Sequence, residues 1–123
     1  MHDIDLLITL TAEKNDENNV TIAFAMGSMA AKRGHATEIL LLSNAVHLAK
    51  EGYADDIAIG DPFPAIKDAL PGFMEAGGKI KVCSACMQHN GVSEDSIREG
   101  IEIVNADYAV DAIMAAEKSL QLN

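Results

Sequence analysis

Several residue types are scarce in this 123-residue chain, and each scarcity excludes a class of protein. Tryptophan is absent, only two residues are cysteine, and nine Lys and Arg stand against nineteen Asp and Glu, for a formal net charge of −10. Two cysteines are too few for a disulfide scaffold. The charge argues against nucleic acid, whose phosphates require an excess of Lys and Arg, and it disfavours an anionic membrane surface.

Long hydrophobic runs are missing as well. The longest stretch of low polarity, residues 21–31, ends at Lys32 and Arg33, and it is about half as long as a membrane span. The first residues are acidic where a secretory signal carries Lys or Arg, so we expect a cytoplasmic protein without a targeting segment. In that reducing compartment, two cysteines three positions apart are typical of a reactive or metal-binding pair.

The rest of the composition is typical of one globular domain. Hydrophobic residues make up 49% of the chain, and a chain of this length can bury roughly two-thirds of its unfolded surface without a staple. No internal repeat, low-complexity tract or linker divides the sequence. We therefore expect a single domain over residues 1–123.

Apolar runs and turn residues predict the order of the elements. Buried strands are predicted at residues 4–10, 36–42, 79–83 and 101–104, and an edge strand at residues 119–123. Helical segments are predicted at residues 20–32, 45–50, 65–76, 97–99 and 108–118. Strands separated by helices require βα units, so we expect an α/β fold in three layers. Its sheet is mostly parallel and five-stranded, with helices on both faces.

The helices carry further expectations. The helix over 20–32 is apolar nearly all round, which indicates that the sheet and another subunit cover it, and Gly27 indicates close packing against another backbone. Pro71 is expected to break or kink the helix that contains it. Ser43 and Asn44 are predicted to cap the short helix that follows them. The last helix has apolar residues on one face, at Val110, Ile113, Met114 and Ala115.

A Cys-x-x-Cys motif carries the clearest chemistry. Cys83 ends the third predicted strand, and Cys86 falls in the turn or first helical turn after it. Chemistry in parallel sheets gathers at the carboxyl ends of strands. A helix start lowers the pKa of a thiol beside it, and two thiols at this spacing can form a disulfide. The neighbours expected to line the site are Ser84, Ala85, Met87 and His89, of which the histidine can exchange a proton.

Four interpretations of the cysteine pair stay open. Cys83 carries sulfane sulfur as a persulfide, or the two thiols form a dithiol–disulfide redox couple, or they bind a metal with His89, or they are small buried hydrophobic side chains. A structural zinc site needs four ligands. The other histidines are scattered along the chain, so we expect neither a metal nor another cofactor.

Another stretch of interest is Asp61-Pro62-Phe63-Pro64, which proline restricts to an extended conformation. Asp61 and Phe63 are candidates for lining a pocket, although a plain surface loop is the more common arrangement. The sequence contains no G-x-G-x-x-G, P-loop or G-x-S-x-G motif. Nucleotide hydrolysis and serine hydrolase chemistry therefore have no support.

The order and spacing of these segments resemble the DsrE/DsrF-like family of small sulfur-relay proteins, which includes the TusD-type subunits. The resemblance covers nearly the whole chain and rests on the strand at 4–10, the apolar helix, residues 36–42, Gly77 to Cys83, Gly91-Val92, residues 99–106 and the closing helix and strand.

This resemblance implies a flavodoxin-like three-layer fold, a homotrimer or hexamer, and one strand-end cysteine that carries a persulfide. Cys83 matches that position, whereas Cys86 is an extra thiol that the best-known carriers do not require. We therefore predict a sulfurtransferase-like persulfide carrier that works between a donor and an acceptor protein, with Cys86 resolving the persulfide on Cys83. The alternatives are a non-catalytic oligomeric module that binds a small ligand or a partner, and a dithiol redox protein.

Overall fold

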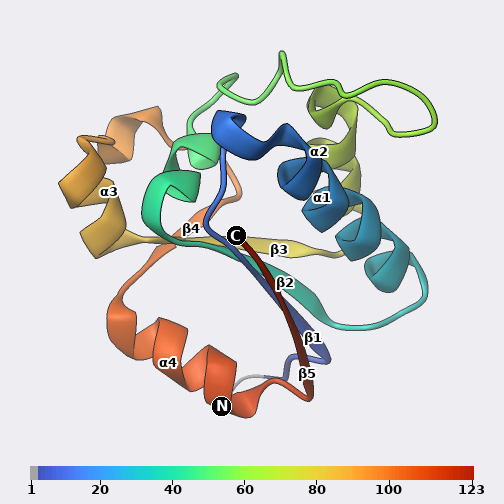
Figure 1. Cartoon of the computed structure of the whole chain (residues 1–123). Coiled ribbons are helices and arrows are strands. Elements are labelled where there is room, and N and C mark those ends of the chain that lie inside the picture. Colours follow the sequence, from blue (N-terminus) through green and yellow to red (C-terminus); the bar gives the residue numbers. More distant parts are fainter. Residues whose placement is uncertain (1–2) are drawn as a thin grey trace.

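A parallel sheet of five strands organises the chain in the computed structural model, which describes residues 3–123 (Figure 1). The strands are β1 (Leu6–Leu10), β2 (Thr37–Leu41), β3 (Lys79–Cys83), β4 (Glu102–Val104) and β5 (Lys118–Leu122). Their order across the sheet is β4-β3-β2-β1-β5, and every neighbouring pair is parallel. The predicted α/β class, the parallel sheet and the edge position of the last strand are confirmed.

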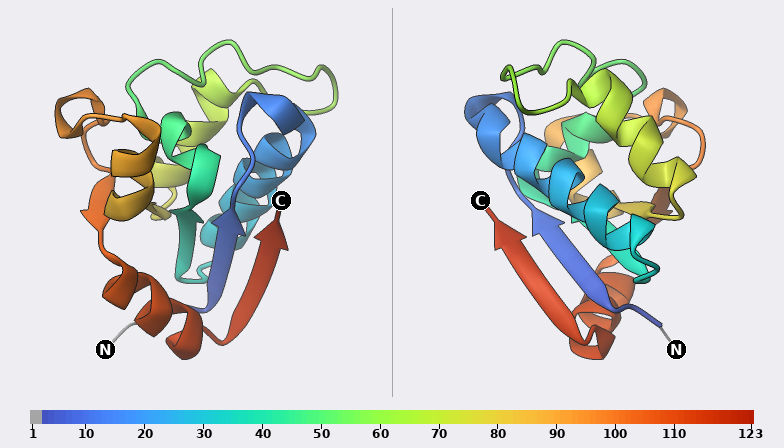
Figure 2. Two further views of the ribbon diagram at one scale, coloured as in Figure 1. Left: turned by 60° about the vertical axis from the view of Figure 1, so that its left-hand side comes forward. Right: turned by 90° about the vertical axis from the view of Figure 1, so that its right-hand side faces the viewer.

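Helices cover both faces of the sheet, as predicted. α1 (Glu17–Lys32) and α2 (Ile66–Glu75) lie on one face, and α4 (Ala106–Ala115) lies on the other (Figures 1 and 2). α3 (Ser84–Asn90) packs against the 3₁₀ helix η2 (Ser43–Ala49) beside the carboxyl ends of β2 and β3. Two shorter 3₁₀ helices are η1 (Lys14–Asp16) and η3 (Glu94–Ser96). None of the helices within residues 3–123 is long and apolar enough to cross a membrane.

Alternation along the central strands divides the core into two clusters, because successive side chains of a strand point to opposite faces. The larger cluster includes Ile8 and Ile39 and lies under α1 and α2. The smaller cluster includes Leu7 and Leu40, which face α4. All four of these side chains are fully buried. Burial on both faces explains why the strand segments read as nearly continuous apolar runs in the sequence.

Side-chain caps place two helix starts earlier than predicted. The carboxylate of Asp16 accepts a hydrogen bond from the Asn19 N–H at 3.1 Å, so α1 begins at Glu17. The side-chain oxygen of Asn105 accepts one from the Tyr108 N–H at 2.9 Å and starts α4 directly after β4. A capping residue is polar and short, so apolar periodicity alone places the first helical residue too late.

Two local predictions are wrong, and a third is wrong in part. Pro71 does not break α2, because the flanking apolar residues Leu70 and Phe73 are buried in the core and hold the helix in place. Ser43 does not cap a helix with its side chain; it begins η2 with a positive φ of 55°. The helix predicted over 97–99 is absent, and Ile97 instead forms an isolated antiparallel bridge with the residue that follows η2.

The close packing at Gly27 is not against another backbone, as predicted, but against side chains. A Cβ atom at this position would lie 3.1 Å from the ring of Phe73 and 3.4 Å from Ile39. The close neighbours of Gly27 are thus side chains of the same chain. Phe73 in turn meets Phe24 edge-to-face, with ring centroids 6.2 Å apart. These contacts join α1 to α2 over the sheet.

Candidate functional site

Strand β3 brings Cys83 to the carboxyl edge of the sheet. The strand lies between β2 and β4, and its last residue pairs with Val104 of β4. Helix α3 begins at the next residue, so Cys86 lies in the first turn of that helix. The positions predicted for both cysteines, at a strand end and in the helical turn after it, match the structure.

The two thiols form a hydrogen-bonded pair without a disulfide. Cys83 is only 6% exposed, and Cys86 is half-buried. Burial raises the pKa of the Cys86 thiol, and its hydrogen bond and charge interaction with Cys83 raise that pKa further. Burial and the neighbouring Cys83 therefore both favour the protonated form of Cys86.

Ser43 supplies the backbone donor that reaches this thiol pair. Its N–H hydrogen-bonds to the sulfur of Cys86, which by itself lowers the pKa of that thiol. Asn90 fixes the arrangement, because its side-chain amide donates to the carbonyl oxygens of Cys86 at 2.9 Å and Ser43 at 3.4 Å. Cys83 precedes α3 but makes no side-chain capping bond. The backbone donor to Cys86 therefore comes from η2, whereas the sequence indicated only the amides that follow Cys83.

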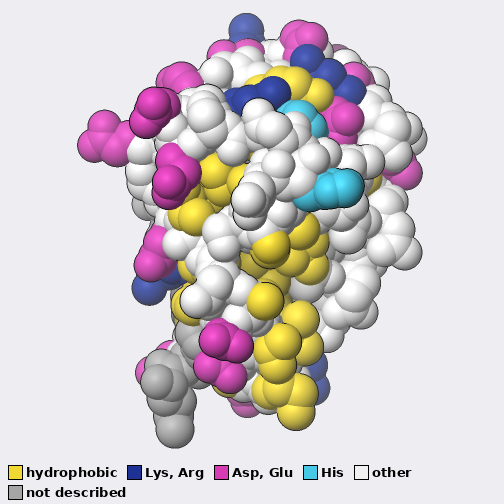
Figure 3. Space-filling model, turned by 90° about the vertical axis from the view of Figure 1, so that its left-hand side faces the viewer, with side chains coloured by type: hydrophobic (Ala, Val, Ile, Leu, Met, Phe, Trp, Pro, Cys, Tyr) yellow, Lys and Arg dark blue, Asp and Glu magenta, His cyan; other side chains and the backbone are white. Residues whose placement is uncertain are grey.

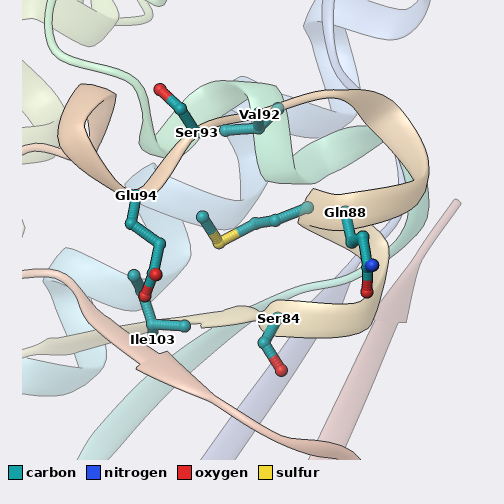
Figure 4. A pocket seen from close by; sticks show the side chains of 7 residues that line it. Ser84, Gln88, Val92, Ser93, Glu94 and Ile103 are labelled. Carbon is teal, nitrogen blue, oxygen red and sulfur yellow. The ribbon is translucent and has the colours of Figure 1, made fainter.

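A cavity of about 390 Å³ lies between α3, the following loop and β4. Its lining residues are Ser84, Met87, Gln88, Val92, Ser93, Glu94 and Ile103. Figure 4 shows Ser84 and Gln88 on α3, Val92 and Ser93 on the loop, Glu94 at the start of η3, and Ile103 on β4, arranged around it. Apolar and polar side chains both line it, as in small-molecule sites.

The remaining predicted lining residues lie elsewhere. Ala85 and His89 belong to α3 but are exposed, and neither lines the cavity. Asp61 and Phe63 lie in the exposed loop before α2, where the Asp61–Pro62 peptide bond is cis. The structure therefore brings together Cys83, Cys86, Ser84 and Met87, and leaves the other four outside.

A polar cluster occupies the same face of β3 as Cys83. Lys81 is buried, forms an ion pair with Glu102, and lies 5.4 Å from the ring centroid of Tyr108. The Tyr108 hydroxyl donates to the buried carboxylate of Glu38 at 2.8 Å. Lys81 forms its ion pair with Glu102 on the neighbouring strand. This cation is therefore paired within the sheet and not with the thiol of Cys83, two residues further along β3.

Metal ligands do not gather at the site. Within residues 3–123, no group of three or more His, Cys, Asp or Glu side chains is arranged to hold a metal ion. The exposed position of His89 leaves the cysteine pair without a third ligand from that residue.

Two relatives with similar sequences come from methanogens. The chain is 28% identical over 102 residues to "Uncharacterized protein MJ0760" of Methanocaldococcus jannaschii, a match that covers 83% of this chain but 37% of that protein. It is 26% identical over 117 residues to "Uncharacterized protein MK0008" of Methanopyrus kandleri, covering 93% and 91% of the two chains. The chain thus spans little more than a third of the first relative and most of the second.

Solved structures share the fold at lower identity. The ychN protein from E. coli superposes with a TM-score of 0.73 at 18% identity, covering 98% of this chain and 99% of that chain. MTH1491 from Methanobacterium thermoautotrophicum gives 0.69 at 14% identity, covering 97% and 99%. Residues 5–122 match the DsrE/DsrF-like family, which is nearly the whole chain. This protein belongs to the DsrE/DsrF-like family.

Proposed function

We propose that this protein is a small sulfur-relay protein that carries sulfane sulfur as a persulfide on Cys83. Membership of the DsrE/DsrF-like family supports a function of this kind. The observation that carries the proposal is the pair of free thiols at the end of β3, with Cys83 at the strand end and Cys86 in the first turn of α3. A reducing compartment such as the cytoplasm would keep both thiols free for this chemistry.

The loading step is a transfer of neutral sulfur. The Cys83 thiolate attacks the outer sulfur of a donor persulfide, a new S–S bond forms at Cys83, and the donor S–S bond breaks. The donor leaves as a thiolate, and no net oxidation occurs. An acceptor thiolate can remove the outer sulfur by the same exchange and regenerate the Cys83 thiolate.

Cys86 offers a second outcome. After it loses its proton, its thiolate can attack the inner sulfur of the persulfide, form a Cys83–Cys86 disulfide and release hydrosulfide. Two electrons from a dithiol reductant would then restore the pair. The raised pKa of Cys86 slows this step at neutral pH, because a thiol reacts as its thiolate. The persulfide on Cys83 would therefore survive long enough to be passed on.

Mass spectrometry of the intact chain tests the carrier role. Wild-type protein incubated with a low-molecular-weight persulfide should gain the mass of one sulfur atom on Cys83. Cys83→Ser should gain none, whereas Cys86→Ser should load and retain the sulfur longer. The proposal is wrong if wild-type protein stays unmodified, or if the added sulfur maps only to Cys86.

The burial of Cys83 favours a second candidate, a non-catalytic module that binds a small ligand. A side chain that is 6% exposed meets a donor poorly, and the cavity lined by Ser84 and Met87 has a volume typical of ligand sites. A binding module predicts that Cys83→Ser keeps its cellular function and that Met87→Trp loses it by filling the cavity. A sulfur carrier predicts that Cys83→Ser loses the cellular function and that Met87→Trp keeps it.

A dithiol redox protein uses the same pair differently. It would cycle between the dithiol and the Cys83–Cys86 disulfide without added sulfur, at a potential on the order of −200 to −300 mV. A redox titration against glutathione separates this role from sulfur transfer. A pair that forms no disulfide over this range is not a redox couple.

A further inference from the structure

Three apolar side chains contribute to the cavity beside α3. Met87 and Val92 are buried, at 2% and 7% exposed, and Ile103 of β4 is half-buried. In Figure 4 the Ser84 and Ser93 side chains point away from the middle of the cavity. Removing apolar surface from water favours binding. The cavity therefore suits a ligand with an apolar body.

Among the described residues that line this cavity, only Glu94 carries a charge. Its exposed side chain begins η3 and extends across the cavity toward Ile103 in Figure 4. None of the ion pairs within residues 3–123 includes Glu94, and its carboxylate accepts no hydrogen bond from that part of the chain. The carboxylate is therefore available to a cation that enters the cavity.

Hydrogen bonds hold the walls of the cavity in place. The Val92 N–H donates to the Met87 carbonyl at 2.9 Å, which joins the loop to α3. The hydroxyl and the N–H of Ser96 both donate to the Ser93 carbonyl, at 2.7 and 3.1 Å. Ile103 is held by the pairing of β4 with β3. A ligand thus meets walls that are already ordered, so binding loses less conformational entropy.

The surroundings of the cavity are acidic as well. Asp95 and Glu99 follow Glu94 in the chain, and both are exposed. Figure 3, which faces the side of the molecule where α3 lies, shows acidic side chains along the left border with hydrophobic side chains beside them. Together with the net charge of −10, this arrangement attracts cations and repels anions.

We infer that this cavity binds a small molecule with a primary ammonium group on an apolar chain, and that Glu94 determines the preference for that charge. The ammonium pairs with the Glu94 carboxylate, and the chain lies against Met87 and Ile103. No Lys or Arg among the described residues lines the cavity, so the carboxylate of an anionic ligand finds no cation there.

This site names a ligand class for the binding module considered above. It does not depend on sulfur transfer, because neither Cys83 nor Cys86 lines the cavity. The two functions can therefore be tested separately on the same protein.

Three probes with the same six-carbon chain test the preference for charge: hexylamine, hexanol and hexanoate. Their binding can be followed through the NMR signal of the Met87 methyl group. We expect hexylamine to bind most tightly and hexanoate most weakly. Ethylamine should bind more weakly than hexylamine, because each methylene group adds buried apolar surface.

Glu94→Gln removes the charge and keeps the size of the side chain. This variant should bind hexylamine roughly two- to fivefold more weakly, the range expected for an exposed ion pair, and should bind hexanol as the wild type does. Asp95→Asn is the matched control, since it makes the same change of charge at an exposed residue that does not line the cavity. It should keep the wild-type affinity for hexylamine.

Several results would overturn the site: equal binding of the three probes, a Met87 signal that does not move, or equal losses in Glu94→Gln and Asp95→Asn. Loading of sulfur on Cys83 is a separate measurement. A protein that binds hexylamine through Glu94 but gains no sulfur refutes the carrier role alone. A protein that gains sulfur but shows no preference for hexylamine refutes the ammonium site alone.

Discussion

Replacing Gly78 with alanine should destabilise the fold through one aromatic ring. Gly78 directly precedes β3, and its N–H donates to the Phe73 carbonyl at 2.9 Å. Its φ angle is not in the left-handed region, so alanine meets no backbone penalty. An added Cβ would overlap three atoms of the Phe73 ring. That ring is fully buried and packs against Phe24, so it cannot turn away without disturbing the core.

Alanine substitutions at three glycines near Phe73 should change the free energy of unfolding by graded amounts. Gly72 lies within α2 and has open space around it, so Gly72→Ala should stabilise by about 0.5–1 kcal/mol through helix propensity. Gly27→Ala gains the same propensity but meets the ring at 3.1 Å, so the two effects should nearly cancel. Gly78 lies outside the helices, so Gly78→Ala gains nothing from helix propensity. Overpacking should lower the free energy of unfolding by about 1–3 kcal/mol, near the upper end of that range because the Phe73 ring is confined.

Urea unfolding followed by circular dichroism measures this series. At about 4 °C per kcal/mol, Gly78→Ala should also lower the thermal midpoint by roughly 10 °C. Phe73→Leu removes the overlapping ring atoms, so Gly78→Ala should cost much less in that background than in the wild type. A change within about 0.5 kcal/mol for Gly78→Ala in the wild type, or equal costs in both backgrounds, would refute the reasoning.

Three further predictions follow from ionisable and capping groups. Burial and a hydrogen bond to Glu13 raise the pKa of Tyr53 to about 12, so its absorbance near 295 nm should titrate there, and stability should fall as pH rises from about 10. The hydrogen bond and charge of Lys81 lower the pKa of Glu102, so Lys81→Met should return the carboxyl NMR titration to its ordinary range. In wild-type protein this pair adds stability above the ordinary Glu pKa, and that contribution is lost as pH falls through the lowered value. Asn105→Ala removes the cap of α4 and should cost about 1 kcal/mol of unfolding free energy.

Each of these predictions has its own control. Glu13→Gln should move the Tyr53 titration toward 10, and no movement would contradict the role of the carboxylate. A Glu102 titration that stays lowered in Lys81→Met would contradict the role of the lysine. Asn44→Ala changes an exposed asparagine that caps nothing, so it should be neutral; equal costs for Asn44→Ala and Asn105→Ala would remove the capping argument.

Much of the candidate site follows from local pattern. The alternating segment before Cys83 predicted β3 with its observed bounds, and the three-residue spacing placed Cys86 in the first turn of α3. Strand periodicity and turn residues act between near neighbours, so one sequence suffices to find them. The sequence did not predict that the Ser43 N–H is the donor at the thiols. Ser43 lies forty residues before Cys83, and a Ser-Asn dipeptide does not by itself indicate a residue with positive φ.

The sequence by itself determined the α/β class, the order of the strands along the chain, and a thiol pair at a strand end. These properties depend on hydrophobic periodicity and on short spacings between residues, which can be read directly from the sequence. Only the tertiary structure decided that Ser43 reaches Cys86, that Gly27 and Gly78 make room for Phe73, and that α4 turns alanines inward and methionine outward. In each case the deciding contact joins residues far apart in sequence, and their meeting depends on how the layers pack.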